Sequence, residues 1–159
     1  MAFRLLIAEP HVEFRQTVRE VVEATRPLLP VDLEVAEAAT LADTHARLAG
    51  WRPHALLLDW DIAADATPLL LNALQHDTPG LRVLVMLPGG APQYRAAVWT
   101  AGACAGIPRD RLDGEWLATA VCLVRRAMER EAHLWQRAVA RCPVLHEAHA
   151  GTDPEVAMR

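Results

Sequence analysis

The chain has 159 residues, a length that suits one compact domain with a short appendage. Its residues are 52% hydrophobic and 23% charged, which allows a substantial core, and its net charge of -4 argues against a general binder of nucleic acid or anionic membrane. Serine and lysine are both absent, which excludes serine nucleophiles, Schiff-base lysines and the lysine of phosphate-binding loops.

Targeting signals and disulfides are not expected. No apolar run approaches the roughly 20 residues that span a bilayer, and the start of the chain is charged too early for a signal peptide. We therefore expect a cytoplasmic protein without a membrane partner. The 3 cysteines are widely spaced and odd in number, so they predict reduced thiols rather than a disulfide framework or a CxxC pair.

Short apolar runs alternate with helical patterns along the chain, as in a parallel sheet covered by helices. The predicted strands are 4–8, 32–36, 55–59, 82–87 and 104–107. The predicted helices between them are 12–25, 41–49, 67–76 and 93–101. Such βα units predict an α/β, flavodoxin-like, doubly wound fold with a five-stranded parallel sheet in the order 2-1-3-4-5 and a long C-terminal helix.

Two helices carry clear signals at their ends. Thr40 and Asp43 have the spacing of a capping box, which predicts the start of the helix over 41–49. Gly50 and Pro53 follow at positions that predict its end.

The last predicted helix is unusually long. It starts after Asp113, a residue type that caps helices, and its apolar spacing continues for about 28 residues or roughly 42 Å. A helix packed on the sheet with a frayed end and a helical extension used for dimerisation or partner docking are equally compatible with this pattern. The second alternative would give Leu134 and Trp135 an apolar cover. We predict a main domain over 1–126 and a helical extension with a flexible tail over 127–159.

Three acidic residues follow predicted strands at the edge where such sheets bind ligands. Glu9 ends the first strand, Asp59 ends the third, and Asp61 lies two residues later. The carboxyl ends of strands 1 and 3 flank the topological switch point of a 2-1-3-4-5 sheet. Either acid alone would be expected to cap a strand in solvent. Together they favour a site that holds a hard divalent cation or accepts a phosphoryl group on a carboxylate.

Three stretches carry a resemblance to a known family: RLLIAEPHVEFRQTVREVVEA, LEVAEAATLADTHARLAGWRPHALLLDWDIA and RVLVMLPGGAPQYRAAVWTAGACAGIPRD. Over about residues 3–126 the chain resembles the receiver domain of response regulators, the CheY-like phosphoacceptor of two-component signalling. The resemblance implies that Asp59 is the phosphoacceptor and that Glu9 is the first acid of the magnesium-binding pair. It implies a histidine kinase or a downstream signalling protein as partner, and no direct binding of nucleic acid.

The chain departs from that family at five positions. Pro10 stands where the second acid, a direct magnesium ligand, is expected, and it offers no side-chain oxygen. Leu87 replaces the Thr or Ser whose hydroxyl bonds the phosphoryl group. Arg109 replaces a lysine, Gly106 removes the aromatic switch residue, and Ala63 replaces a proline after the acceptor loop.

These departures predict an atypical receiver, or pseudo-receiver, that acts through protein contacts with weak or no phosphorylation at Asp59. Mg²⁺ binding through Glu9, Asp59 and Asp61 should be weakened, and Arg109 is a candidate phosphate contact. The alternative is a conventional Mg-dependent phosphoacceptor that tolerates these changes. In either case we do not expect an enzyme.

Two other functional interpretations rest on short motifs of the sequence. Asp59 and Asp61 resemble the Asp-x-Asp nucleophile motif of haloacid-dehalogenase-type (HAD-like) phosphatases, but the required lysine is absent and the motif follows the third strand. Cys142, His146 and His149 have a spacing that could present ligands to zinc, although a soft tail with incidental histidines is the simpler interpretation.

Three aromatic residues near the fifth strand are candidates for an interface. Tyr94, Trp99 and Trp116 surround the face through which receivers commonly form dimers and bind partners, although core packing would explain Trp99 and Trp116 equally well. A homodimer through this face or through the C-terminal helix is the expected assembly, if one forms. Of the histidines, His54 is expected at a strand edge, and His11 is expected at the surface or hydrogen-bonded to Glu9.

Overall fold

A computed structural model describes residues 2–141 of the chain. The strands are β1 (Phe3–Ala8), β2 (Leu33–Ala38), β3 (Ala55–Asp59), β4 (Arg82–Leu87) and β5 (Ala105–Pro108). The α-helices are α1 (Val12–Thr25), α2 (Leu41–Trp51), α3 (Thr67–Asp77), α4 (Pro92–Thr100) and α5 (Gly114–Arg141). Short 3-10 turns follow α1, β3 and β5. The chain divides into two compact units, Met1–Val124 and Arg125–Arg159.

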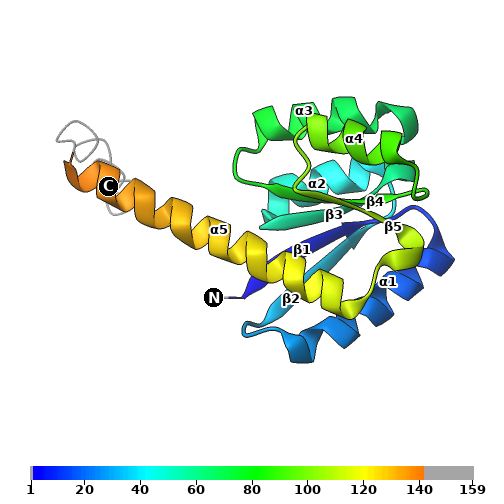
Figure 1. Cartoon of the computed structure of the whole chain (residues 1–159), viewed down its shortest axis with the longest axis horizontal. Coiled ribbons are helices and arrows are strands. Elements are labelled where there is room, and N and C mark those ends of the chain that lie inside the picture. The colour runs from blue at the N-terminus through cyan, green and yellow to red at the C-terminus, as the bar shows by residue number, and fades with distance from the viewer. Residues whose placement is uncertain (1, 142–159) are drawn as a thin grey trace, which may run out of the picture. The chain divides into compact units, whose positions relative to one another are not determined.

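The first unit is built on one parallel sheet with the strand order β2-β1-β3-β4-β5, as predicted. Helices α2, α3 and α4 cover one face of this sheet, and α1 and the start of α5 cover the other (Figure 1). The three central strands are apolar at almost every position, because both of their faces are buried. The α/β doubly wound fold that the sequence predicted is therefore confirmed.

The helix boundaries follow from local signals with one exception. The Thr40 side chain accepts a hydrogen bond from the Asp43 amide at 3.1 Å and starts α2 as expected. The predicted end of α2 is wrong, because the helix continues through Gly50 to Trp51 and ends at Arg52 in the left-handed region, with φ 50°. Pro53 cannot continue a helix, so α2 must end before it, but Pro53 does not determine the last residue of the helix.

The long last helix is confirmed. Asp113 Oδ1 accepts a hydrogen bond from the Trp116 amide at 2.7 Å, which caps the first turn of the 28-residue helix α5. Within the first unit, Gly114 lies against Ala24 of α1, where an added Cβ would meet the Ala24 Cβ at 3.1 Å. A small residue at this position permits the close approach of the two helices.

The second unit is described only over 125–141, which is helical throughout. Arg125 pairs with Glu129 one turn later, an arrangement that stabilises an exposed helix. Leu134 and Trp135 are 55% and 53% exposed, in line with the expectation that they need an apolar cover. Across residues 2–141, no helix is both long enough and apolar enough to cross a membrane.

Candidate functional site

The register of the sheet brings the two acids of the predicted site side by side. Ala8 pairs with Leu58 between β1 and β3, so the residues that follow them, Glu9 and Asp59, leave neighbouring strand ends together. Both side chains are fully buried, with 0% exposure. Burial of two ionisable groups at one point costs free energy unless protons, hydrogen bonds or cations compensate their charge.

Arg109 supplies the compensating charge for Asp59. It follows β5 directly, and its Nε donates to Asp59 Oδ2 at 2.6 Å while a terminal nitrogen donates to Asp59 Oδ1. The same terminal nitrogen lies 2.7 Å from Asp61 Oδ2. A guanidinium can make such a parallel pair of bonds because its donors form a planar fork, which a lysine ammonium lacks. Asp59 raises the pKa of Arg109 further above its already high ordinary value, so this cation is permanent.

The backbone completes the coordination of Asp59. The amide of Asp61 donates to Asp59 Oδ1 at 2.8 Å, as a cap of the 3-10 turn Trp60–Ile62. Each Asp59 oxygen thus already accepts from a strong donor. The resemblance to receiver domains implied that Arg109 lies near Asp59 and Asp61, and the structure adds the two-bond contact that spacing alone could not predict.

The Glu9 carboxyl has His11 as its hydrogen-bond partner, and the Arg15 guanidinium donates to the Glu9 backbone carbonyl at 2.7 Å. Glu9 Oε1 accepts from the His11 amide at 2.7 Å and lies 2.9 Å from His11 Nδ1. Its Oε2 is buried and has no hydrogen-bond partner among the described residues. Burial, followed by the neighbouring Asp59 carboxyl, raises the pKa of Glu9 to about 7, against a value of 4.5 in water. Glu9 is therefore partly protonated at neutral pH.

His11 connects the buried acids with solvent. Its side chain is 56% exposed, and its Nε2 lies 3.7 Å from Asp61 Oδ2. The predicted hydrogen bond with Glu9 is confirmed, and so is the expected exposure. The proximity of His11 to Asp61 was not predicted, although His11 and Asp61 each come two positions after a buried acid at neighbouring strand ends.

Glu9, His11 and Asp59 form a group that could hold a metal ion, since their ligand atoms all lie within 4.8 Å of one another. This donor set does not fit Mg²⁺ well. Magnesium prefers an octahedral shell of oxygen atoms, whereas Pro10 contributes none and His11 contributes a nitrogen.

Leu87 and Gly106, at the two positions expected to transmit activation, are tightly packed. Leu87 is 1% exposed at the end of β4, where it offers no hydroxyl. A Cβ added to Gly106 would meet Leu87 Cδ1 at 3.2 Å and Val98 Cγ2 at 3.1 Å. Leu87 and Val98 therefore fill the space next to Gly106, and an aromatic side chain there would need its neighbours to move.

The predicted interface residues have different environments. Trp99 is 69% exposed on α4, which rules out the core packing that the sequence also allowed. Trp116 is half-buried. Tyr94 is half-buried as well and packs edge-on against Trp60, with ring centroids 5.0 Å apart. His54 is structural as expected, because its Nδ1 accepts from the Arg4 amide at 3.0 Å.

The candidate zinc ligands all lie in the C-terminal tail. Cys142, His146 and His149 lie outside the described residues. Of the described cysteines, Cys104 is exposed and Cys122 half-buried, and both are free thiols.

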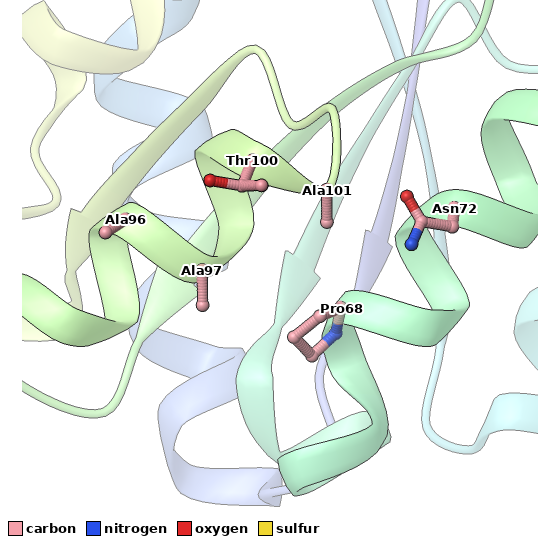
Figure 2. Close-up of a pocket in the computed structure, with 6 residues that line it drawn as sticks. All are labelled: Pro68, Asn72, Ala96, Ala97, Thr100 and Ala101. Carbon is pink, nitrogen blue, oxygen red and sulfur yellow. The ribbon is translucent and has the colours of Figure 1, made fainter.

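A hollow of about 400 Å³ lies between α3 and α4 (Figure 2). Figure 2 shows side chains from the two helices on either side of it; the lining residues are Pro68, Asn72, Ala96, Ala97, Thr100 and Ala101. None of them is ionisable or nucleophilic beyond a threonine hydroxyl. This hollow therefore offers no acid or base of its own.

Comparison with solved structures identifies this architecture. The receiver domain of a DNA-binding response regulator from Colwellia psychrerythraea matches with 17% identity and a TM-score of 0.65 over 78% of this chain and 98% of its own. A response regulator from Thermotoga maritima matches with 14% identity and a TM-score of 0.67 over 78% and 98% of the two chains. A CheY-like receiver domain protein from Methanospirillum hungatei matches with 18% identity and a TM-score of 0.65 over 82% and 99%.

The chain has a receiver-domain fold. No protein-family model and no curated protein matches its sequence. At identities of 14–18% the structural likeness identifies the fold alone, and function has to be argued from the site of this receiver-like domain.

Proposed function

We propose that the chain is an atypical receiver protein of two-component signalling, which acts through protein contacts with weak or no phosphorylation at Asp59. It would be a non-enzymatic, cytoplasmic protein whose partner is a histidine kinase or a downstream signalling protein. Residues 1–126 would form the receiver-like domain, and 127–159 a helical extension with a tail.

The observation that carries this proposal is the ion pair between Asp59 and Arg109. A carboxylate that accepts a phosphoryl group must present an oxygen lone pair in line with the leaving group. Both Asp59 oxygens accept hydrogen bonds from Arg109, and the Asp59 side chain is fully buried. The fixed guanidinium stands where the resemblance expects a lysine, and it holds both oxygens of the acceptor.

Two further observations support the proposal. Leu87 offers no hydroxyl to a phosphoryl oxygen, and each charge-assisted contact of this kind contributes about 1.5–3 kcal/mol. Position 106 is a glycine, so the chain lacks the aromatic ring whose movement would report phosphorylation. Leu87 and Val98 fill the space beside it. We therefore expect this chain to accept a phosphoryl group, to stabilise it and to respond to it less well than a conventional receiver does.

The output surface would be the face formed by α4, β5 and the start of α5. Trp99 is 69% exposed there, and an exposed tryptophan is a typical anchor of a protein interface. Tyr94 and Trp116 are half-buried on the same elements and could extend that surface. Leu134 and Trp135 are the corresponding candidates on the helical extension, where they would contribute to a homodimer or to partner docking.

The test is a phosphoryl-transfer experiment on the full chain. The protein is incubated with acetyl phosphate and Mg²⁺, or with beryllofluoride and Mg²⁺, and intact mass and amide spectra are recorded. We expect no adduct that depends on Asp59. Asp59→Ala serves as the acceptor-minus variant, and Asp65→Ala as a matched control, since Asp65 is exposed on the adjacent 3-10 turn Ala64–Ala66.

The alternative is a conventional phosphoacceptor. A phosphoryl adduct that is present in the unmodified chain and in Asp65→Ala, but absent from Asp59→Ala, would establish it. A change of the amide spectrum around β5 with beryllofluoride would point the same way. The HAD-like phosphatase reading would require turnover of a phosphate ester that Asp59→Asn abolishes.

A further inference from the structure

We propose that Glu9, His11 and Asp59 form a binding site for a late first-row transition metal ion, such as Zn²⁺ or Co²⁺, in preference to Mg²⁺. This inference goes beyond the proposed function, because a metal ion could bind here whether or not Asp59 accepts phosphate. It rests on the charge balance of the crevice, an unpaired buried oxygen and the chemistry of the three donors.

The charge balance of the crevice favours a dication. Three carboxyl groups, those of Glu9, Asp59 and Asp61, meet at the ends of β1 and β3, and Arg109 is the cation that contacts two of them. Arg15 also lies close, but its guanidinium donates to the Glu9 backbone carbonyl at 2.7 Å and is shared with Glu37. With all three carboxyls ionised, the single charge of Arg109 leaves two negative charges on them. A divalent ion would neutralise them, whereas protonation of Glu9 removes only one.

The unpaired oxygen belongs to Glu9. Its Oε2 is fully buried and lacks a hydrogen-bond partner among the described residues, and a ligand oxygen of its carboxyl lies within 4.8 Å of one from Asp59. A hydrogen bond between two carboxyls requires a proton on one of them. When both are ionised, no donor lies between them, and a cation is the group that would satisfy both.

The third donor selects the kind of ion. His11 brings an imidazole nitrogen to the two carboxylates, and the ligand atoms of the three residues lie within 4.8 Å of one another. Imidazole suits zinc, cobalt and nickel, whereas magnesium prefers an all-oxygen shell. Pro10, which lies between two of these ligands in the sequence, offers no oxygen to favour magnesium.

Arg109 does not have to leave for the ion to bind. Each carboxylate oxygen has two lone pairs: Arg109 and the Asp61 amide take both on Asp59 Oδ1, whereas Arg109 takes only one on Asp59 Oδ2. The ion would bind Asp59 through the free position on Oδ2, together with Glu9 and His11. His11 is 56% exposed, which provides a path from solvent to the buried carboxyls.

The test measures metal binding directly on the full chain. To remove a competing tail site, all variants carry His146→Gln and His149→Gln. Isothermal titration with Zn²⁺ and with Mg²⁺ gives the affinities, and the visible absorption of Co²⁺ reports coordination by nitrogen and oxygen in a site of low coordination number. We expect Zn²⁺ to bind at least about tenfold more tightly than Mg²⁺.

The variants assign the ligand. His11→Gln should lower the Zn²⁺ affinity about tenfold or more and abolish the Co²⁺ spectrum, while it leaves the weak Mg²⁺ affinity unchanged. His76→Gln, which changes an exposed histidine on α3, is the matched control and should bind like the parent. Equal affinities for the two metals, or Zn²⁺ binding that survives His11→Gln, would overturn the proposal. Neither result depends on acetyl phosphate, so the outcome is separate from that of the phosphorylation test.

Discussion

Removal of the Arg109 side chain is the most direct test of the crevice. In Arg109→Ala, the carboxylate of Asp59 would remain buried with only the Asp61 amide as donor, beside a second buried acid, Glu9. Breaking a buried ion pair by removing one partner costs about 3–5 kcal/mol, and an exposed pair contributes at most about 1 kcal/mol. Arg109 is 23% exposed and Asp59 is 0% exposed, so we expect a loss of about 2–4 kcal/mol in the free energy of unfolding.

A double-mutant cycle separates the interaction energy of the Asp59–Arg109 pair from the effect of each substitution alone on stability. Asp59→Asn removes the buried charge and leaves Arg109 able to reach Asp61 or solvent, so it should cost only about 1–2 kcal/mol. The double variant should be more stable than Arg109→Ala alone, because no uncompensated charge remains. We expect a coupling energy of at least about 1.5 kcal/mol.

The assay is urea unfolding at neutral pH, followed by far-ultraviolet circular dichroism and tryptophan fluorescence. Arg111→Ala provides a matched control, since Arg111 is exposed on the same 3-10 turn, Arg109–Arg111. Additive effects of Asp59→Asn and Arg109→Ala would refute the reasoning. So would an Arg109→Ala variant as stable as Arg111→Ala.

Three other changes test the remaining features. Glu9 has a pKa of about 7 in the folded chain and 4.5 as its reference, so the native state holds the proton more tightly, and stability should fall as pH rises from about 4.5 to 7. Glu9→Gln should remove about 2–3 kcal/mol of this pH dependence, measured by urea unfolding at pH 5 and 7.5; an unchanged slope would contradict it. Gly106→Phe should lower stability by about 1–3 kcal/mol through contact with Leu87 and Val98, and a rise in melting temperature would show that the space is open. Thr40→Ala should cost about 1 kcal/mol by loss of the α2 cap, whereas Thr40→Ser should cost little.

Much of the fold could be predicted from the sequence because its determinants are local. The central strands are continuous apolar runs, which only a sheet covered on both faces can bury, and the helices between them repeat at helical spacing. Alternation of the two then restricts the topology, since crossovers between parallel strands are right-handed. The end of α2 was predicted wrongly: the helix continues past Gly50 to Trp51, which packs against the core, and Arg52 ends it in the left-handed region.

The site could be predicted as a set of residues but not as an arrangement. Glu9 and Asp59 were expected together, since strand order alone brings the ends of β1 and β3 to one edge. Arg109 is separated from Asp59 by 50 positions, and whether its guanidinium makes two bonds, one or none depends on side-chain torsions that no spacing encodes.

The residues around Gly106 could likewise be predicted from the sequence, but their packing could not. From the sequence, Leu87 and Gly106 are two separate losses, one of a hydroxyl and one of an aromatic ring. In the structure they lie together, and the leucine side chain fills the space that the glycine leaves. Local pattern thus determined which strands and helices form and which acids meet at the sheet edge. Only the tertiary structure decided how Arg109 binds Asp59 and how Leu87 packs on Gly106, because both depend on close contacts between side chains distant in the chain.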